Sequence, residues 1–260
     1  MKADTTHLLS ASHQPTNISM KLALVVPLLA VLFLSIVAHA DNILFYGGNF
    51  DPMNQNANGL GNENDAIVGG QPYGAATYQN FVIPDGHTWN IQSLFTNNLS
   101  DLNPSSAYYE IRSNVSENHP GNLLLSGTAS GTDFTWTATA RNGFGYNEYT
   151  AHVQFSPGIT LGAGTYWMSV VPQDPNGAGR SFNTNTFDCN HCVGTQINDQ
   201  QYFDSAFFGS NFGNANEQGV FTTFSSGVDG YEGTPEPSSL VLLGSGLLGA
   251  GGLIRRKLLS

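Results

Sequence analysis

Short stretches in which hydrophobic and polar residues alternate recur between residues 41 and 234. In the clearest of them, Tyr149, Ala151, Val153 and Phe155 alternate with three polar side chains. Because successive side chains of a β-strand point to opposite faces of a sheet, this pattern predicts a strand with one buried face. Residues 134–139 and 87–96 alternate in the same way, so the pattern predicts a series of strands that each bury one side.

Further strands are predicted at 42–46, 79–83, 107–113, 122–126, 164–172, 180–184 and 219–224, separated by stretches rich in Gly, Asn, Pro and Asp. No long stretch of residues 41–234 has the 3.6-residue period of an amphipathic helix. Strands at this spacing predict an all-β fold, an antiparallel two-sheet β-sandwich of the jelly-roll type, in one domain over residues 41–234. A barrel or a short solenoid is the alternative.

The tryptophans differ in their predicted places. Trp89 and Trp136 lie on the hydrophobic faces of their strands, so both are predicted to be in the core. Trp167 alternates with Tyr166, Met168 and Val170, and the pattern does not decide which face it occupies.

Two long hydrophobic runs flank this region. The first, residues 22–37, follows Met20 and Lys21 and ends at Ala38-His39-Ala40, which is the order of a secretory signal peptide. Residues 20–40 are therefore predicted to be a signal peptide, with a signal helix, that signal peptidase removes to leave Asp41 as the mature N-terminus. Residues 1–19 are polar and unpatterned, which indicates a start codon assigned too far upstream.

The second hydrophobic run ends in a basic cluster. Residues 238–254 carry no charge and reach about 25 Å as a helix, enough to span the hydrocarbon core of a thin bilayer. Arg255, Arg256 and Lys257 follow directly and are predicted to stay on the cytoplasmic side, which places the preceding residues outside. The sequence thus predicts a transmembrane helix at 238–254.

Pro235, Glu236 and Pro237 stand just before this run. The order of Pro-Glu-Pro, hydrophobic helix and basic end resembles the PEP-CTERM sorting signal of exported proteins from Gram-negative, polysaccharide-secreting bacteria, over residues 235–260. The resemblance implies recognition by an exosortase, a membrane-embedded cysteine transpeptidase that removes the helix and passes the protein to the cell surface or the extracellular matrix. It implies that the inner-membrane anchor is transient, as in other signals whose helix is lost from the mature product.

The excess of acidic residues limits the classes of partner that residues 41–234 can bind. Between residues 41 and 234 the basic side chains are Arg112, Arg141 and Arg180, whereas all 19 acidic residues of the chain except Asp4 and Glu236 lie there. A nucleic-acid partner is excluded because phosphate neutralisation needs a basic patch. Anionic membrane surfaces are predicted to repel this acidic domain.

One turn-rich stretch has the spacing of a calcium loop. Asn54, Asn56, Asn58, Gly59 and Asp65 occupy its first, third, fifth, sixth and twelfth places. Calcium prefers carboxylates at the first and last places, and flanking helices are missing from the pattern. Calcium is therefore a weak prediction, set against an ordinary Asn-Gly turn, and no cofactor is predicted with it.

The two cysteines, Cys189 and Cys192, lie in a second loop-like stretch, 174–200. In an exported protein such an isolated pair is predicted to form a disulfide. Zinc is the alternative, and it needs two more ligands, for example from His87, His119 or His152. The pair has neither the preceding strand of a thioredoxin-like site nor the following His of a haem attachment site.

The sequence does not predict a catalytic site. Glu63-Asn64-Asp65 is the nearest approach to the Glu-x-Asp-x-x-Glu motif of jelly-roll glycosidases of the laminarinase type, and Val68 occupies the position of the third acid. No nucleophile elbow, zinc helix or phosphate loop is found in the sequence. The protein is therefore expected not to be an enzyme.

Aromatic residues supply a different hypothesis. An exposed group of them is able to stack on sugar rings while acidic groups accept hydroxyl hydrogen bonds; the candidates are Tyr108, Tyr109, Tyr146, Tyr149, Tyr166, Trp167, Tyr202 and Phe203. Two hypotheses follow: a non-catalytic surface or matrix protein associated with biofilm or exopolysaccharide, and a carbohydrate-binding lectin-like module or degenerate glycoside hydrolase.

Overall fold

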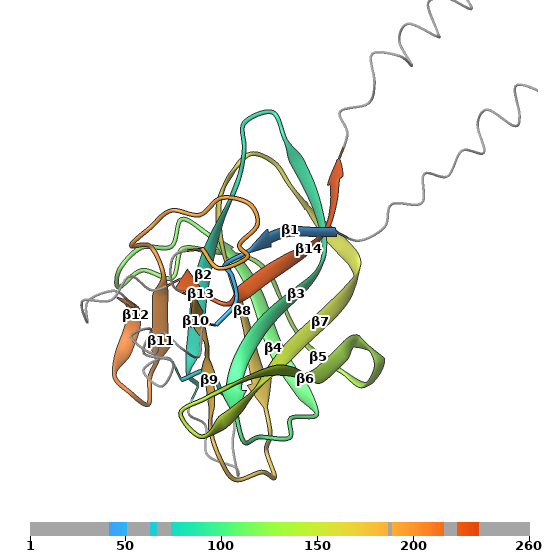
Figure 1. Ribbon diagram of the computed structural model, residues 1–260. Helices are drawn as coiled ribbons and strands as arrows, with labels where there is room; N and C mark the ends of the chain where they lie inside the picture. The colour runs from blue at the N-terminus through green and yellow to red at the C-terminus, as the bar shows by residue number, and fades with distance from the viewer. Residues whose placement is uncertain (1–41, 51–62, 67–73, 187–188, 216–222, 234–260) are drawn as a thin grey trace, which may run out of the picture. The chain divides into compact units, whose positions relative to one another are not determined.

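The computed structural model describes residues 42–50, 63–66, 74–186, 189–215 and 223–233, and these form an all-β, antiparallel structure (Figure 1). The first of its two large sheets has the strand order β1 (Asn42–Tyr46), β14 (Ser226–Gly233), β3 (Thr88–Ser100), β7 (Tyr146–Leu161) and β6 (Phe134–Gly143). The short strand β9 (Ser181–Asn183) also pairs with β3. The predicted all-β, antiparallel architecture is thereby confirmed.

The second large sheet has the order β12 (Ser210–Asn214), β11 (Tyr202–Ser205), β2 (Ala76–Ile83), β8 (Gly164–Gln173), β4 (Ser106–Ser113) and β5 (Asn122–Ser130). A 3-10 turn, η1 (Gly131–Asp133), leads from β5 into β6. Two further short strands, β10 (Asn185–Thr186) and β13 (Thr223–Phe224), form a small ladder of their own.

The main hydrophobic core lies between the two large sheets. Phe81 of β2 is fully buried and stacks on Trp89 of β3, with ring centroids 6.0 Å apart. Met168 and Val170 of β8 face the same core as Val153 of β7. Burial of these side chains from both sheets is what holds the sheets together, at roughly 2 kcal/mol for each large hydrophobic side chain.

Trp136 differs from its predicted place. It packs against the core but is only partly buried, and its ring stacks on Tyr149 at a centroid distance of 5.1 Å. The reason is topological: β6 is the last strand of its sheet, so one flank of Trp136 has no neighbouring strand. Trp89, by contrast, is buried as predicted.

A second hydrophobic cluster lies on the opposite face of the second sheet. Trp167 belongs to it, together with Tyr78, Tyr202, Phe212 and Val115. Because side chains alternate along β8, Trp167 points to this second cluster, whereas Met168 and Val170 point to the main core. Both faces of β8 are therefore buried.

Most predicted strands are present, often longer than predicted. Strands β11, β12 and β14 were not predicted, because Gly, Asn and Ser in them read as turn residues. The predicted signal helix and the predicted membrane helix lie outside the described residues. Within the described residues, nothing helical has the length and hydropathy needed to cross a bilayer.

The first and last described strands are neighbours. β1 pairs antiparallel with β14, so that Asn42 lies opposite Gly230, and β14 ends with Gly233 opposite Thr88 of β3. The described chain consequently begins and ends at the same end of the same sheet (Figure 1).

Candidate functional site

The residues predicted for export and sorting lie outside the described ranges. These are Ala38, Ala40 and Asp41 at the signal cleavage site, Pro235, Glu236 and Pro237 at the sorting tripeptide, and Arg255, Arg256 and Lys257 at the basic end. What the structure describes is the point where the tail joins the domain. Only Thr234 separates Gly233, the last residue of β14, from the tripeptide.

The end of β14 is held to the adjoining turn by an exposed ion pair. Glu232 contacts Nδ1 of His87, in the turn that precedes β3. Exposed pairs of this kind contribute at most about 1 kcal/mol, so the backbone pairing of residues 226–233 with β3 is what mainly fixes this strand.

Cys189 and Cys192 are bonded to each other as a disulfide. The short loop that they close packs on the start of the domain, because the Asn190 carbonyl accepts a hydrogen bond from Asn49 N at 2.7 Å and Val193 pairs with Tyr46. No group of three or more potential His, Cys, Asp or Glu metal ligands occurs in the described part of the chain.

The three histidines considered as further zinc ligands each have a protein partner. His87 pairs with Glu232, and His152 lies 3.3 Å from Asp229 through Nε2. His119 accepts a hydrogen bond from Gly121 N at 3.1 Å through Nδ1. None of the three is placed beside the disulfide by these contacts.

Asp65 is the described member of the calcium-loop pattern; Asn54, Asn56 and Asn58 lie outside the described residues. Its carboxylate is fully buried, accepts a hydrogen bond from Ser181 N at 3.2 Å and lies 3.5 Å from Nε of Arg180. Burial raises the pKa of Asp65 to about 7. The cation nearest this carboxylate in the described structure is thus a protein side chain.

The glycosidase-like residues Glu63, Asn64 and Asp65 connect the two sheets. Nδ2 of Asn64 donates to Oδ1 of Asn98 on β3 at 3.0 Å and to the Val170 carbonyl on β8 at 2.8 Å. Glu63 pairs with Arg180, just before β9. The arrangement gives these three side chains a structural role, because each is buried and bonded within the protein.

Glu110 is a further buried carboxylate that protein groups satisfy. Glu110 pairs with Arg112 at 2.9 Å and accepts a hydrogen bond from the Tyr78 hydroxyl. Burial, and after it the charge of Glu110, raises the pKa of Tyr78 well above its usual value. Burial likewise raises the pKa of the nearby Asp204 carboxyl.

The predicted aromatic group does not form one platform. Tyr109, Trp167 and Tyr202 are buried, and the partly buried Tyr108 and Tyr166 use their hydroxyls on Glu110 and on the Gly162 carbonyl. Phe203 packs on Phe208 at 6.3 Å. The remaining two candidates, Tyr146 and Tyr149, line a common hollow.

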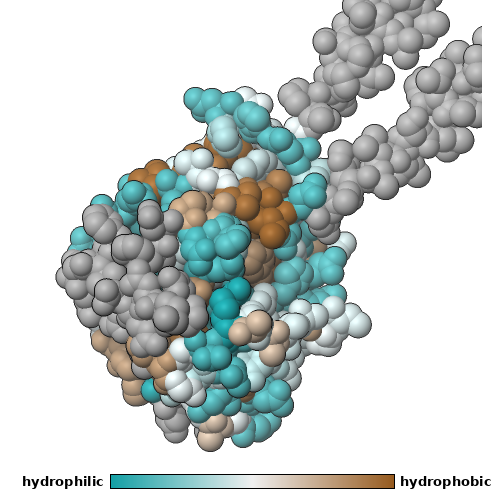
Figure 2. All heavy atoms as spheres, viewed as in Figure 1, coloured by the Kyte–Doolittle hydropathy of each residue, from teal (hydrophilic) through white to brown (hydrophobic). Residues whose placement is uncertain are grey.

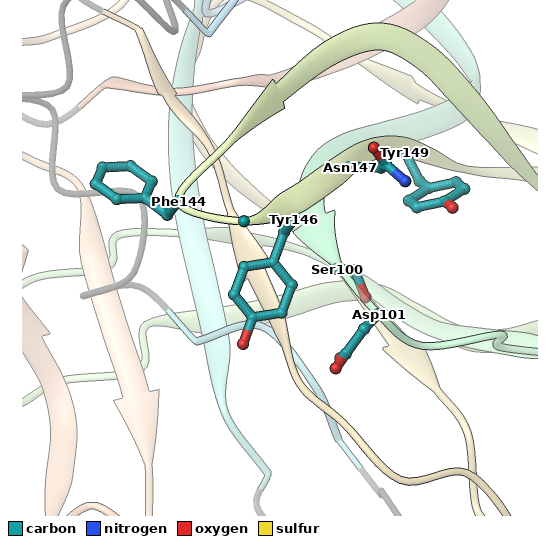
Figure 3. A pocket seen from close by; sticks show the side chains of 7 residues that line it. Ser100, Asp101, Phe144, Tyr146, Asn147 and Tyr149 are labelled. Carbon is teal, nitrogen blue, oxygen red and sulfur yellow. The ribbon is translucent and has the colours of Figure 1, made fainter.

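This hollow has a volume of about 570 Å³ and lies where the end of β3 meets the start of β7. Its lining consists of Ser100, Asp101, Phe144, Gly145, Tyr146, Asn147 and Tyr149. Figure 3 shows Ser100 and Asp101 between the two tyrosines, with Asn147 beside Tyr149 and Phe144 pointing away from the group. The antiparallel pairing of Ser100 with Asn147 brings the two strands together here.

A tight hairpin turn sets one side of the hollow. Phe144 and Gly145 both have positive φ, 54° and 88°, as a two-residue turn with the twist of its strands requires. Positive φ is unfavourable for a bulky residue such as Phe144, and its ring packs against the buried Phe50 at 6.4 Å. The Gly-Phe-Gly-Tyr sequence signals this turn, whereas nothing in the sequence signals that Asp101 approaches it.

The hydrophobic surface elsewhere is scattered. On the face in Figure 2, hydrophilic side chains predominate over the described residues and hydrophobic ones form separate areas. The large exposed hydrophobic side chains of the described residues are Ile43 of β1, Leu123 and Leu124 of β5, Val193 and Ile197 before β11, and the adjacent Phe207 and Phe208 between β11 and β12. The tyrosine-lined hollow is therefore the better candidate for a binding site.

Comparisons with known proteins concern the tail. Residues 234–257 match the PEP-CTERM protein-sorting motif. Searches of curated proteins and of solved structures gave no match to the chain. The chain carries a C-terminal PEP-CTERM protein-sorting motif and is accordingly an exported protein targeted by an exosortase.

Proposed function

We propose that this protein is a non-catalytic cell-surface or extracellular-matrix component, which an exosortase releases from a transient membrane anchor. The observation that carries the proposal is the sorting motif at residues 234–257, directly after the last strand of the β-domain. The protein is then the substrate in the sorting reaction, and the β-domain is the cargo.

The geometry of the domain supports a non-catalytic role. The buried carboxylates Glu63, Asp65, Glu110 and Glu148 are each engaged by an arginine of the protein. A carboxylate held in this way is bonded to its partner rather than presented to a substrate. The acidic composition and lack of lysine in residues 41–234 suit a soluble domain outside the cell, associated with biofilm or exopolysaccharide.

Fractionation of the producing cells tests the sorting part of the proposal. The full chain is compared with a Pro235→Ala/Pro237→Ala variant and with a variant in which Arg255, Arg256 and Lys257 are alanine. We expect both variants to accumulate in the inner membrane with the tail uncleaved, because each removes a recognition element of the motif. Leu258→Ala, beyond the matched residues, is the control and should be sorted normally.

Mass spectrometry of the surface fraction gives the decisive readout. Peptides from residues 238–254 should be missing from the mature protein. Their presence there would show a permanent single-pass anchor and overturn release by an exosortase. Release of reducing sugar from exopolysaccharide by the purified protein would overturn the non-catalytic role.

A second candidate function is carbohydrate binding by a lectin-like module or a degenerate glycoside hydrolase. The hollow between Tyr146 and Tyr149 favours it, because it combines aromatic rings with hydrogen-bonding groups on the surface. Pull-down with exopolysaccharide of the same cells tests this function independently of sorting.

A further inference from the structure

We propose that the hollow at the start of β7 is a binding site for a neutral oligosaccharide, with Asp101 and Asn147 as its hydrogen-bonding groups and Tyr149, which shares a face of β7 with Asn147, as its stacking ring. This inference goes beyond the sorting function, because a protein can be displayed on the surface without binding a sugar. It rests on the contacts and charges around the hollow.

The first argument is that three polar groups of the hollow have no hydrogen-bond partner among the described residues. The hydroxyls of Tyr146 and Tyr149 and the side-chain amide of Asn147 make no hydrogen bond to other described residues. Asp101 is exposed and accepts a hydrogen bond from Arg180 N through Oδ1 at 2.7 Å, and a carboxylate can accept more hydrogen bonds than this one. The hollow thus offers both donors and acceptors, which is what a hydroxyl-rich ligand requires.

The second argument is that the aromatic rings of the lining are already fixed by packing. Tyr149 stacks on Trp136 with ring planes 9° apart, and Tyr146 packs edge-on against Phe182 at a centroid distance of 5.8 Å. Rings that are held by packing lose little conformational entropy when a ligand binds. Both rings of the lining are therefore held in place before a ligand binds.

The third argument excludes other classes of ligand. Among the described residues of the lining, Asp101 is the only charged one, so an anionic ligand meets repulsion there and no cation to pair with. A divalent cation requires several oxygen ligands in a defined geometry, and one carboxylate with one amide does not supply them. A purely apolar ligand leaves the polar lining unpaired, at a cost. A neutral sugar matches both the hydrogen-bonding groups and the rings.

The volume is consistent with this class. About 570 Å³ lies within the range of small-molecule sites, roughly 300–1,000 Å³, and leaves room for a short oligosaccharide. The position at the end of two strands, beside the Phe144-Gly145 turn, leaves the hollow open to solvent, so that an internal segment of a long glycan is able to enter.

Calorimetric titration of the exported protein tests the site. The probes are maltopentaose, cellopentaose and laminaripentaose, with trigalacturonate as an anionic comparison, and any detergent present must lack a sugar headgroup. We expect saturable binding of at least one neutral probe and none of trigalacturonate. Asp101→Ala and Asn147→Ala should each weaken it about two- to tenfold, the effect of one hydrogen bond.

Matched variants separate the hollow from the fold. Asn122→Ala changes an exposed asparagine at the start of β5, outside the hollow, and should leave binding unchanged. Tyr146→Phe and Tyr149→Phe keep the rings, so they should preserve packing and reduce affinity only through the lost hydroxyls. Thermal unfolding of each variant shows whether it is folded.

The proposal is overturned if no neutral probe binds at about 10 mM, a concentration well above ordinary weak affinities. It is also overturned if binding persists unchanged in Asp101→Ala and Asn147→Ala, or if trigalacturonate binds more tightly than the neutral probes. Each of these results leaves the sorting function intact, because the tail variants test that function separately.

Discussion

Replacing Glu148 with alanine should destabilise the hairpin that carries the tyrosine-lined hollow. Glu148 lies on β7 between Asn147 and Tyr149, and its side chain is fully buried. Its Oε2 accepts hydrogen bonds from Nε of Arg141 at 2.5 Å and from the Thr139 hydroxyl at 2.7 Å, and its Oε1 accepts one from the Thr184 hydroxyl at 3.1 Å. These bonds join β6 and β7 to the segment after β9.

The expected loss in the free energy of unfolding depends on which charged group each substitution leaves without a partner. Glu148→Ala leaves Arg141 without its ion-pair partner, but the side chain of Arg141 is 26% exposed and can be hydrated. We therefore expect the free energy of unfolding to fall by about 2–4 kcal/mol. Arg141→Ala leaves the buried carboxylate without its cation and should cost about 3–5 kcal/mol. Glu148→Gln retains hydrogen-bonding capacity without charge and should cost about 1–2 kcal/mol.

Urea denaturation followed by tryptophan fluorescence measures these differences, since Trp136 lies beside Tyr149. Glu117→Ala, an exposed glutamate in the turn after β4, is the control and should change stability by less than about 0.5 kcal/mol. The double variant of Arg141 and Glu148 should lose less than the sum of the single variants, because the two side chains interact. If Glu148→Ala unfolds at the same midpoint as Glu117→Ala, the role assigned to the pair is wrong.

Three other predictions concern different parts of the domain. A Cβ at Gly227 would overlap the ring of Phe95, so Gly227→Ala should lower the free energy of unfolding by about 1–3 kcal/mol or more, and an unchanged thermal midpoint would contradict this packing. Burial raises the pKa of Asp65 from 3.8 to about 7, so its stabilising contribution is present below pH 3.8 and lost as pH rises towards 7; the free energy of unfolding of Asp65→Asn minus that of the unsubstituted protein should increase over this interval, and a constant difference would contradict the shift. Cys189 and Cys192 should resist alkylation without reductant and take up two alkyl groups after reduction, as mass spectrometry will show; alkylation without reductant would contradict the disulfide.

Alternation was sufficient to predict strands where one face is buried and the other is polar. Along β7, Ala151, Val153 and Phe155 are buried in the core, as the pattern predicts. The same rule fails where both faces are buried. Trp167 faces the second cluster while Met168 faces the core, because β8 lies inside its sheet and residues of β11 and β12 cover its other side.

Strand β14 was not predicted from the sequence because of its glycines. Its sequence contains three glycines and reads as a loop, yet it is a central strand between β1 and β3. Gly227 and Gly230 approach Phe95 and the Asn90 carbonyl so closely that a side chain would overlap them. The glycines are thus explained by close packing, which depends on residues more than a hundred positions away and is not visible locally.

The hollow was only half predictable. Tyr146 and Tyr149 were among the candidates because aromatic side chains can stack on sugar rings. Ser100 and Asp101 join them only through the pairing of β3 with β7, a contact between strands that alternation does not specify. The sorting motif, by contrast, is contiguous, and its recognition from the sequence is confirmed.

The adjacency of β1 and β14 restricts where the two processing reactions take place. The cleavage site predicted before Asp41 and the sorting tripeptide that begins at Pro235 adjoin, in the sequence, two strands that meet at the same end of the first sheet. Residues 234–237, between β14 and the predicted helix, span at most about 14 Å when extended, which is a short tether. While the predicted helix is in the bilayer, that length keeps β14 near the membrane surface, and the exosortase must bind its tripeptide beside a paired strand.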